Sequence, residues 1–145
     1  MGARSEMGYW VVVPFAYLLA GTTKFAVNCV RHRQLAFDQI GLGGLPSTHT
    51  AIVSAPAWLL VMDGMVHSEV FAVALSLVAI VVIDAMDLRR KLERVHDVLK
   101  QELPDSVAVQ GLRRRVGHNP LEVAAGLAVG AVAAGLIHWL DLRAG

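Results

Sequence analysis

Apolar residues along the chain gather in four long segments separated by shorter polar stretches. The segments cover about residues 8–30, 50–65, 70–86 and 121–140. A helix that spans a bilayer needs about 20 apolar residues, with roughly 17 as the lower limit. The first and fourth segments reach this length, whereas the second and third are marginal and carry Asp63 and Asp84 near their ends. The pattern predicts an all-α integral membrane bundle of about four transmembrane helices.

The stretch between the third and fourth segments, residues 87–117, is expected to be cytoplasmic. Charges of both signs recur at helical spacing from Arg89 to Lys100, which predicts an interfacial helix. Asp is a favourable N-cap, so Asp87 is expected to start this helix. We therefore expect residues 1–145 to form a single membrane domain with one cytoplasmic helix.

Composition supports a membrane protein over the alternative of a soluble bundle with buried helices. The apolar fraction is 55% and the mean hydropathy is +0.53, which is high for a soluble protein. The net charge of +1 hides a strong asymmetry, because eleven of the 13 Lys and Arg residues fall on one side of a four-span bundle. Only Arg4 and Arg143 fall on the other side. The positive-inside rule predicts that the basic side is cytoplasmic and that both termini are outside. The expected partners are membrane lipids, and no nucleic-acid partner is expected.

Two histidines lie at the starts of apolar segments on the basic side. His49 opens the second segment, and His118 opens the fourth, just before Pro120. Pro suits the first turn of a helix, so His118 and Glu122 are expected to lie one turn apart on one face. A carboxylate that holds one imidazole nitrogen leaves the other free as a nucleophile or base. The alternatives are that His49 caps its helix or pairs with a headgroup, and that His118 and Glu122 form a structural pair.

Basic residues converge on the same layer as these histidines. Two of the helix ends there are N-termini, whose free N–H groups and positive dipole ends favour an anion. The pattern therefore indicates chemistry on a phosphate. Asp84 is expected to be a charge partner of a nearby base, with no role in catalysis. The other groups at these helix ends are Lys24, Arg31, Arg89 and Arg90.

Three motifs carry a resemblance to a known family. Pro46-Ser47-Thr48-His49 and the segment from His118 to Gly126 resemble the second and third motifs of the type 2 phosphatidic acid phosphatase superfamily. Lys24 and Arg31 match the spacing of its first motif. The chain is most similar to the divergent branch of small membrane proteins that are related to acid phosphatases and vanadium-dependent haloperoxidases. All the motifs occur in order, each at a helix end on the basic side.

The resemblance implies a metal-free phosphoryl transfer with no cofactor. His118 would attack phosphorus and form a phosphohistidine, Glu122 would orient His118, and His49 would protonate the leaving oxygen. The residues that would hold the phosphate are Lys24, Arg31, Ser47, Thr48, Arg89 and Arg90. The implied substrate is a lipid phosphate or a prenyl mono- or diphosphate, taken from among membrane lipids.

The chain departs from the superfamily pattern at three places. Glu122 stands where Asp is usual, and Asp87 replaces a usual glycine. The arginine that the superfamily places before the third-motif histidine has two candidate locations, Arg113–Arg115 or Arg89 and Arg90, and we favour the latter. The alternative to a phosphatase is a non-catalytic membrane protein that binds anionic lipid headgroups. Gly126, Gly130 and Gly135 would serve helix packing within one chain or in a homo-oligomer.

Overall fold

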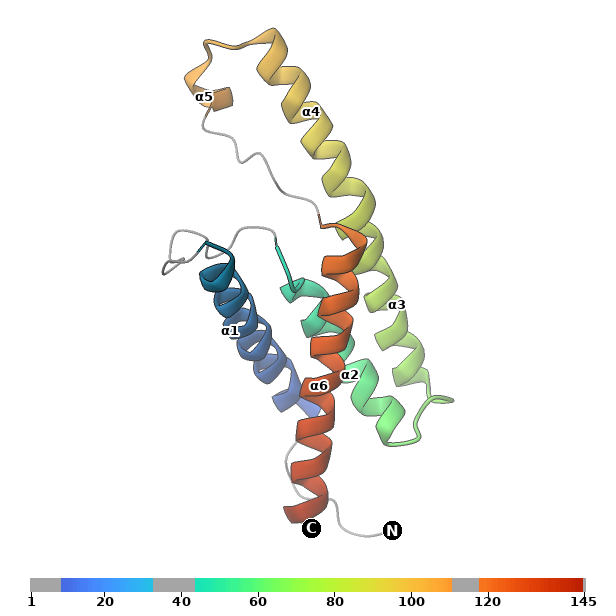
Figure 1. Ribbon diagram of the computed structural model, residues 1–145. Helices are drawn as coiled ribbons and strands as arrows, with labels where there is room; N and C mark the ends of the chain where they lie inside the picture. The colour runs from blue at the N-terminus through green and yellow to red at the C-terminus, as the bar shows by residue number, and fades with distance from the viewer. Residues whose placement is uncertain (1–8, 33–43, 111–117, 145) are drawn as a thin grey trace.

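The computed structural model describes residues 9–32, 44–110 and 118–144, and every regular element in these ranges is helical. Figure 1 shows α1, α2, α3 and α6 arranged as a bundle, with α4 projecting beyond one end. The predicted all-α membrane bundle is confirmed. In chain order the elements are η1 (Tyr9–Val11), α1 (Val12–His32), α2 (Thr48–Met62), α3 (Glu69–Ile83), the π-helical turn η3 (Asp84–Leu88), α4 (Arg89–Glu102), α5 (Val107–Gln110) and α6 (Pro120–Ala144).

Three helices in the described part of the chain are long and apolar enough to cross a membrane. They are Tyr9–Arg31, Glu69–Asp87 and Pro120–Arg143, close to the expected first, third and fourth segments. The fourth apolar helix, α2, has 15 residues. At 1.5 Å per residue it is about 22 Å long, which is shorter than the hydrocarbon core of a bilayer, about 30 Å.

The end of α2 comes earlier than the expected Met65, because a glycine closes the helix. Gly64 has a φ of 71°, a conformation that glycine adopts without steric cost. The N–H of Gly64 donates to the carbonyl of Val61 at 3.0 Å, and that of Met65 donates to Leu60 at 2.9 Å. These two bonds form the Schellman arrangement that satisfies the last carbonyls of a helix.

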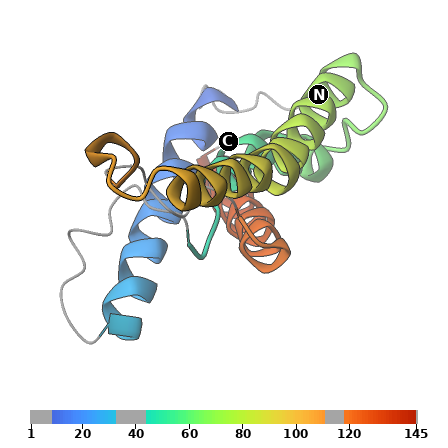
Figure 2. The same cartoon turned by 90° about the horizontal axis from the view of Figure 1, so that it is seen from above.

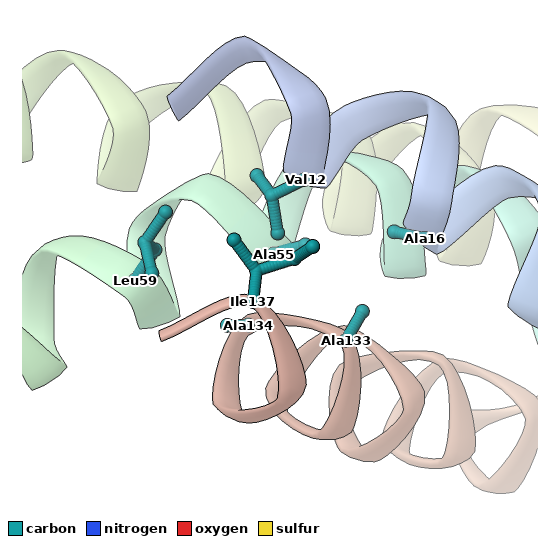
Figure 3. Packing of buried hydrophobic residues seen from close by; sticks show 7 residues of the cluster. All are labelled: Val12, Ala16, Ala55, Leu59, Ala133, Ala134 and Ile137. Carbon is teal, nitrogen blue, oxygen red and sulfur yellow. The ribbon is translucent and has the colours of Figure 1, made fainter. Parts of the chain in front are cut away.

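The short helix α2 is the centre of the bundle and contacts α1, α3 and α6. Most of its buried residues are small, so neighbouring helices approach it closely; they are Thr50, Ala51, Ser54, Ala55, Ala57, Leu59 and Leu60. In contrast, α3 has no buried residue, and its apolar surface is left for lipid. Figure 2 shows the same bundle from above, with the rod of α3 and α4 running across the view. A cluster from α1, α2 and α6 forms the main core (Figure 3): Val12, Ala16, Ala55, Leu59, Ala133, Ala134 and Ile137.

The contact between α2 and α6 depends on two glycines of α6. A Cβ atom on Gly126 would come 2.5 Å from the carbonyl oxygen of Ser47. A Cβ on Gly130 would overlap the hydroxyl of Ser54 and come 2.9 Å from the carbonyl oxygen of Ala51. The two glycines are four residues apart, the spacing that lets membrane helices bring their backbones together.

A polar cluster joins three helices at the opposite end of the bundle from α4. Asp63, the C-cap of α2, accepts a hydrogen bond from the Tyr9 hydroxyl. Its Oδ1 lies 3.1 Å from Nδ1 of His138 on α6. Because Tyr9 begins the first span and His138 lies near the end of the last, this cluster fixes the C-terminal end of α2 near one membrane interface.

The helix α4 continues directly from α3, so the expected start at Asp87 is wrong. Asp87 lies within the π-helical turn η3, and its Oδ2 accepts a hydrogen bond at 2.8 Å from Nζ of Lys91, one turn later. The three elements have 15, 5 and 14 residues and form one rod (Figure 1). Asp87 fails as an N-cap because the preceding turn is already helical and its carbonyls continue the helix. A helix between Arg89 and Lys100 is present as expected, and it continues the line of α3 beyond the end of the bundle.

Gly130→Ala is expected to lower the unfolding temperature, because the added methyl group forces α2 and α6 apart. Overpacking costs about 1–3 kcal/mol, and here the new Cβ would also meet backbone atoms of Ala51 and Ala55. We therefore expect a cost above the roughly 1 kcal/mol that Ala gains over Gly in a helix. The matched control is Gly135→Ala on the same helix, where the new Cβ would meet only Met62 Cε at 3.7 Å. Circular dichroism during heating in detergent micelles measures both. Equal unfolding temperatures for the two variants would contradict the close contact.

Candidate active site

The first turn of α6 is held by a reciprocal pair of hydrogen bonds. The backbone N–H of Asn119 donates to Oε2 of Glu122 at 3.1 Å, and the backbone N–H of Glu122 donates to Oδ1 of Asn119 at 2.8 Å. This is a capping box, in which the N-cap residue and the third helical residue satisfy each other's free N–H groups. Pro120 is the first helical residue, as expected from its missing N–H. The start of α6 is therefore fixed by its own sequence.

His118 and Glu122 lie one helical turn apart at this helix start, as their spacing predicted. Nδ1 of His118 is 3.8 Å from Oε2 of Glu122, a distance typical of an ion pair and longer than a hydrogen bond. His118 is 5% exposed and Glu122 is 3% exposed. Burial of a carboxylate is costly unless other groups compensate its charge. The pair is thus a buried unit in which Nδ1 faces the carboxylate.

The backbone of His118 contacts the π-helical turn between α3 and α4. Its N–H donates to the carbonyl of Ala85 at 3.2 Å, and Ala85 is buried. A π-helical turn disturbs the regular i to i−4 ladder and often occurs at functional sites. This bond brings the half-buried Asp84 and the start of α4 to the same end of the bundle as His118.

The first turn of α2 is tied to the first turn of α6. The backbone N–H of Ser47 donates to the carbonyl of Glu122 at 2.9 Å. Ser47 is the N-cap of α2, and its side chain is fully buried. Its hydroxyl accepts the N–H of Thr50 at 3.4 Å and the hydroxyl of Thr50 at 2.9 Å. Ser47 therefore has a structural capping role, which the sequence motif alone did not indicate.

The other members of the second motif lie in the same turn but differ in exposure. Thr48 is half-buried, and His49 is exposed at the surface of the first turn of α2. The backbone bond from Ser47 to Glu122 brings this turn beside α6. His49 is thus at the same end of the bundle as His118, and its side chain is exposed whereas that of His118 is buried.

The helix α1 contributes a cation to the same site. Lys24 is half-buried, and its ammonium group interacts electrostatically with the carboxylate of Glu122. Asn28, one turn further along α1, is 9% exposed. Asn28 was not among the predicted site residues, although a polar residue four positions after Lys24 falls on the same helix face. Arg31 follows Lys24 by seven residues and is exposed near the end of α1.

The remaining predicted groups are described only in part. The backbones of Arg89 and Arg90 begin α4 beside the π-helical turn, and their side chains lie outside the described residues. Arg113–Arg115 lie wholly outside them. Within residues 9–32, 44–110 and 118–144, no group of three or more His, Cys, Asp or Glu side chains is arranged to hold a metal ion.

The groups that the described contacts bring together are therefore Lys24, Ser47, His118 and Glu122, with Thr50 and Asn119 as their supports. They come from α1, α2 and α6, and the π-helical turn closes the same end of the bundle. The arrangement offers an imidazole, a buried carboxylate, an ammonium group and the N-terminus of α2 at one place. Such a set suits an anionic substrate.

Comparison with known proteins identifies the family of the chain. The Divergent PAP2 family matches the chain over residues 8–133, from the first transmembrane helix to the middle of α6. A search of curated proteins and a search of solved structures find no match. The matched range contains all three motifs, and the helices indicate an integral membrane protein. The chain therefore belongs to the Divergent PAP2 family, a divergent branch of the type 2 phosphatidic acid phosphatases.

Proposed function

We propose that this protein is a metal-free membrane phosphatase that acts on a lipid phosphate or a prenyl mono- or diphosphate through a phosphohistidine intermediate. The observation that carries the proposal is the buried pair of His118 and Glu122, 3.8 Å apart, beside the N-terminus of α2. Membership of a phosphatase-related family supports the same reaction class. No metal ion takes part in the proposed steps.

In the first step, Nε2 of His118 attacks phosphorus. This nitrogen is the proposed nucleophile because Nδ1 is the ring atom near Glu122. The Nε2–P bond forms, and the bond from phosphorus to the ester oxygen of a monophosphate, or to the bridging oxygen of a diphosphate, breaks. The electron pair of that bond goes to the leaving oxygen. The imidazole gains positive charge as it attacks, and the carboxylate of Glu122 stabilises that charge.

His49 supplies the proton that the leaving oxygen needs. Its exposed position in the first turn of α2 suits a group that exchanges protons with solvent. In the second step, His49 accepts a proton from water as the water attacks phosphorus. The Nε2–P bond then breaks, inorganic phosphate leaves, and His118 is restored.

Phosphate binding is assigned to the cations and helix N-terminus around this pair. Lys24 is a cation whose charge interacts with Glu122, and the N–H groups and positive dipole end of the first turn of α2, which includes Thr48, favour an anion. Arg31, Arg89 and Arg90 complete the proposed set. Arginine suits this work because its planar donors match phosphate oxygens. For Ser47 we propose that its backbone, as N-cap, orients these N–H groups.

The substrate is proposed to reach the site from the membrane. The helix α2 is about 22 Å long, and its C-terminal end is fixed beside Tyr9 and His138 at the far end of the bundle. Its N-terminus therefore stops short of the opposite interface of a bilayer about 30 Å thick. The phosphate of a lipid lies in the headgroup layer, so it is proposed to move a short way inward to reach the site while the lipid chains stay in the bilayer. The excess of Lys and Arg supports a cytoplasmic location for this side and an outside location for both termini.

Purified protein is expected to release phosphate from a panel of lipid and prenyl phosphates, and His118→Ala is expected to abolish this release. Glu122→Gln should slow the reaction by roughly 10²- to 10⁴-fold, because a neutral amide does not stabilise the charged imidazole. Phosphate release in detergent micelles measures both, with unfolding temperatures as the control for folding. Phosphate release at the unmutated rate by His118→Ala would overturn the mechanism. Binding of lipid phosphates without turnover would instead support a headgroup-binding protein.

The loss of phosphate release caused by His49→Ala is expected to depend on the leaving group. An alkyl or prenyl oxygen needs a proton as it leaves, so its release should fall by roughly 10²-fold or more. An activated aryl phosphate should lose much less, because its oxygen leaves without that proton. The measurement is kcat/KM for each substrate type, in the unmutated protein and in His49→Ala. The loss of kcat/KM in the variant is then compared between the two types. Equal losses for both types would contradict His49 as the acid.

A further inference from the structure

The two capping-box hydrogen bonds between Asn119 and Glu122 also involve the carboxylate oxygen that faces His118. Its backbone N–H holds Oε2 of the carboxylate at 3.1 Å, and its side-chain oxygen holds the backbone N–H of Glu122 at 2.8 Å. The same Oε2 atom is the one that lies 3.8 Å from Nδ1 of His118. Asn119 therefore holds both the carboxylate and the backbone of Glu122, the residue that faces His118.

We infer that Asn119 is a positioning residue for the His118–Glu122 pair, an inference that rests on the phosphatase function proposed above. Asn119 is exposed and acts through Glu122. A carboxylate at the end of a three-bond side chain samples several rotamers unless contacts select one. The bond from the Asn119 N–H to Oε2 selects the rotamer in which that oxygen faces His118, and the bond from Oδ1 keeps the backbone of Glu122 in the geometry that this rotamer needs.

This positioning role also explains why position 122 carries glutamate. A capping box uses a Glu or Gln side chain at the third helical position, because that chain is long enough to reach back to the N-cap N–H. Asp is one methylene shorter. At position 122 a glutamate can hold the cap and face His118 with the same oxygen, which links the start of α6 to the orientation of the imidazole.

The kinetic test compares three variants. Asn119→Ala keeps the backbone N–H that bonds Oε2 but removes the side-chain acceptor that holds the Glu122 backbone in the geometry this rotamer needs. Asn119→Ser restores an N-cap acceptor. Ser68→Ala is the matched control, because the Ser68 side chain caps α3 by accepting the N–H of Phe71 at 3.2 Å, outside the site. Each Ala variant loses one N-cap, so both should lower the unfolding temperature.

Only Asn119→Ala is expected to lower kcat, by roughly 10- to 100-fold with little change in KM, as for a misplaced catalytic group. Asn119→Ser should recover most of kcat, and Ser68→Ala should keep the unmutated kcat. Equal kcat values for Asn119→Ala and Ser68→Ala, each corrected for the folded fraction, would overturn the inference.

A second measurement separates this inference from the proposed function. In protein labelled with ¹⁵N-histidine in detergent micelles, the ring of neutral His118 should be a single tautomer with the proton on Nδ1, facing Glu122. Asn119→Ala should give averaged ring signals, whereas Ser68→Ala should leave them unchanged. Unchanged His118 signals in Asn119→Ala would overturn the positioning role. A protein that shows the expected change but releases no phosphate would overturn the phosphatase function alone.

Discussion

The close packing of α2 against α6 is the constraint on which the rest of the structure depends. Gly126 and Gly130 let the two backbones meet, since a methyl group at either position would strike α2. This approach allows the N–H of Ser47 to reach the carbonyl of Glu122. The second and third motifs of the chain are thereby joined by a backbone bond, although about 70 residues separate them in sequence.

The same contact makes a buried carboxylate tolerable at the level of the membrane. Glu122 is 3% exposed, and a lone charge there would be costly. Three groups compensate it: the N–H of Asn119, the imidazole of His118 and the ammonium of Lys24. Each comes from a different local feature, namely a helix cap, the residue before it and the helix α1. In the proposed chemistry, the groups that stabilise Glu122 would also prepare His118 for attack.

The broad fold followed from the sequence because lengths of apolar runs report directly on membrane spans. The His118–Glu122 pair also followed, because helical spacing fixes which residues share a face. The extent of α2 and the continuity of α3 with α4 did not follow. They depend on Gly64 in a left-handed conformation and on a π-helical turn at Asp84–Leu88, which no periodicity indicates. Asn119-Pro120-Leu121-Glu122 carried a readable capping-box signal, whereas the burial of Asn28 depends on tertiary packing.

The central claim is that His118 carries the phosphoryl group during turnover, and the most direct measurement is to trap it there. A ³²P-labelled aryl phosphate suits the experiment, because its leaving group departs without a proton and the first step is fast. After a rapid alkaline quench, the account predicts a label bound to the protein that is stable in base, labile in acid and located on the peptide containing His118. It also predicts no label in His118→Ala. A label on any other residue, or an active protein that never becomes labelled, would contradict the account.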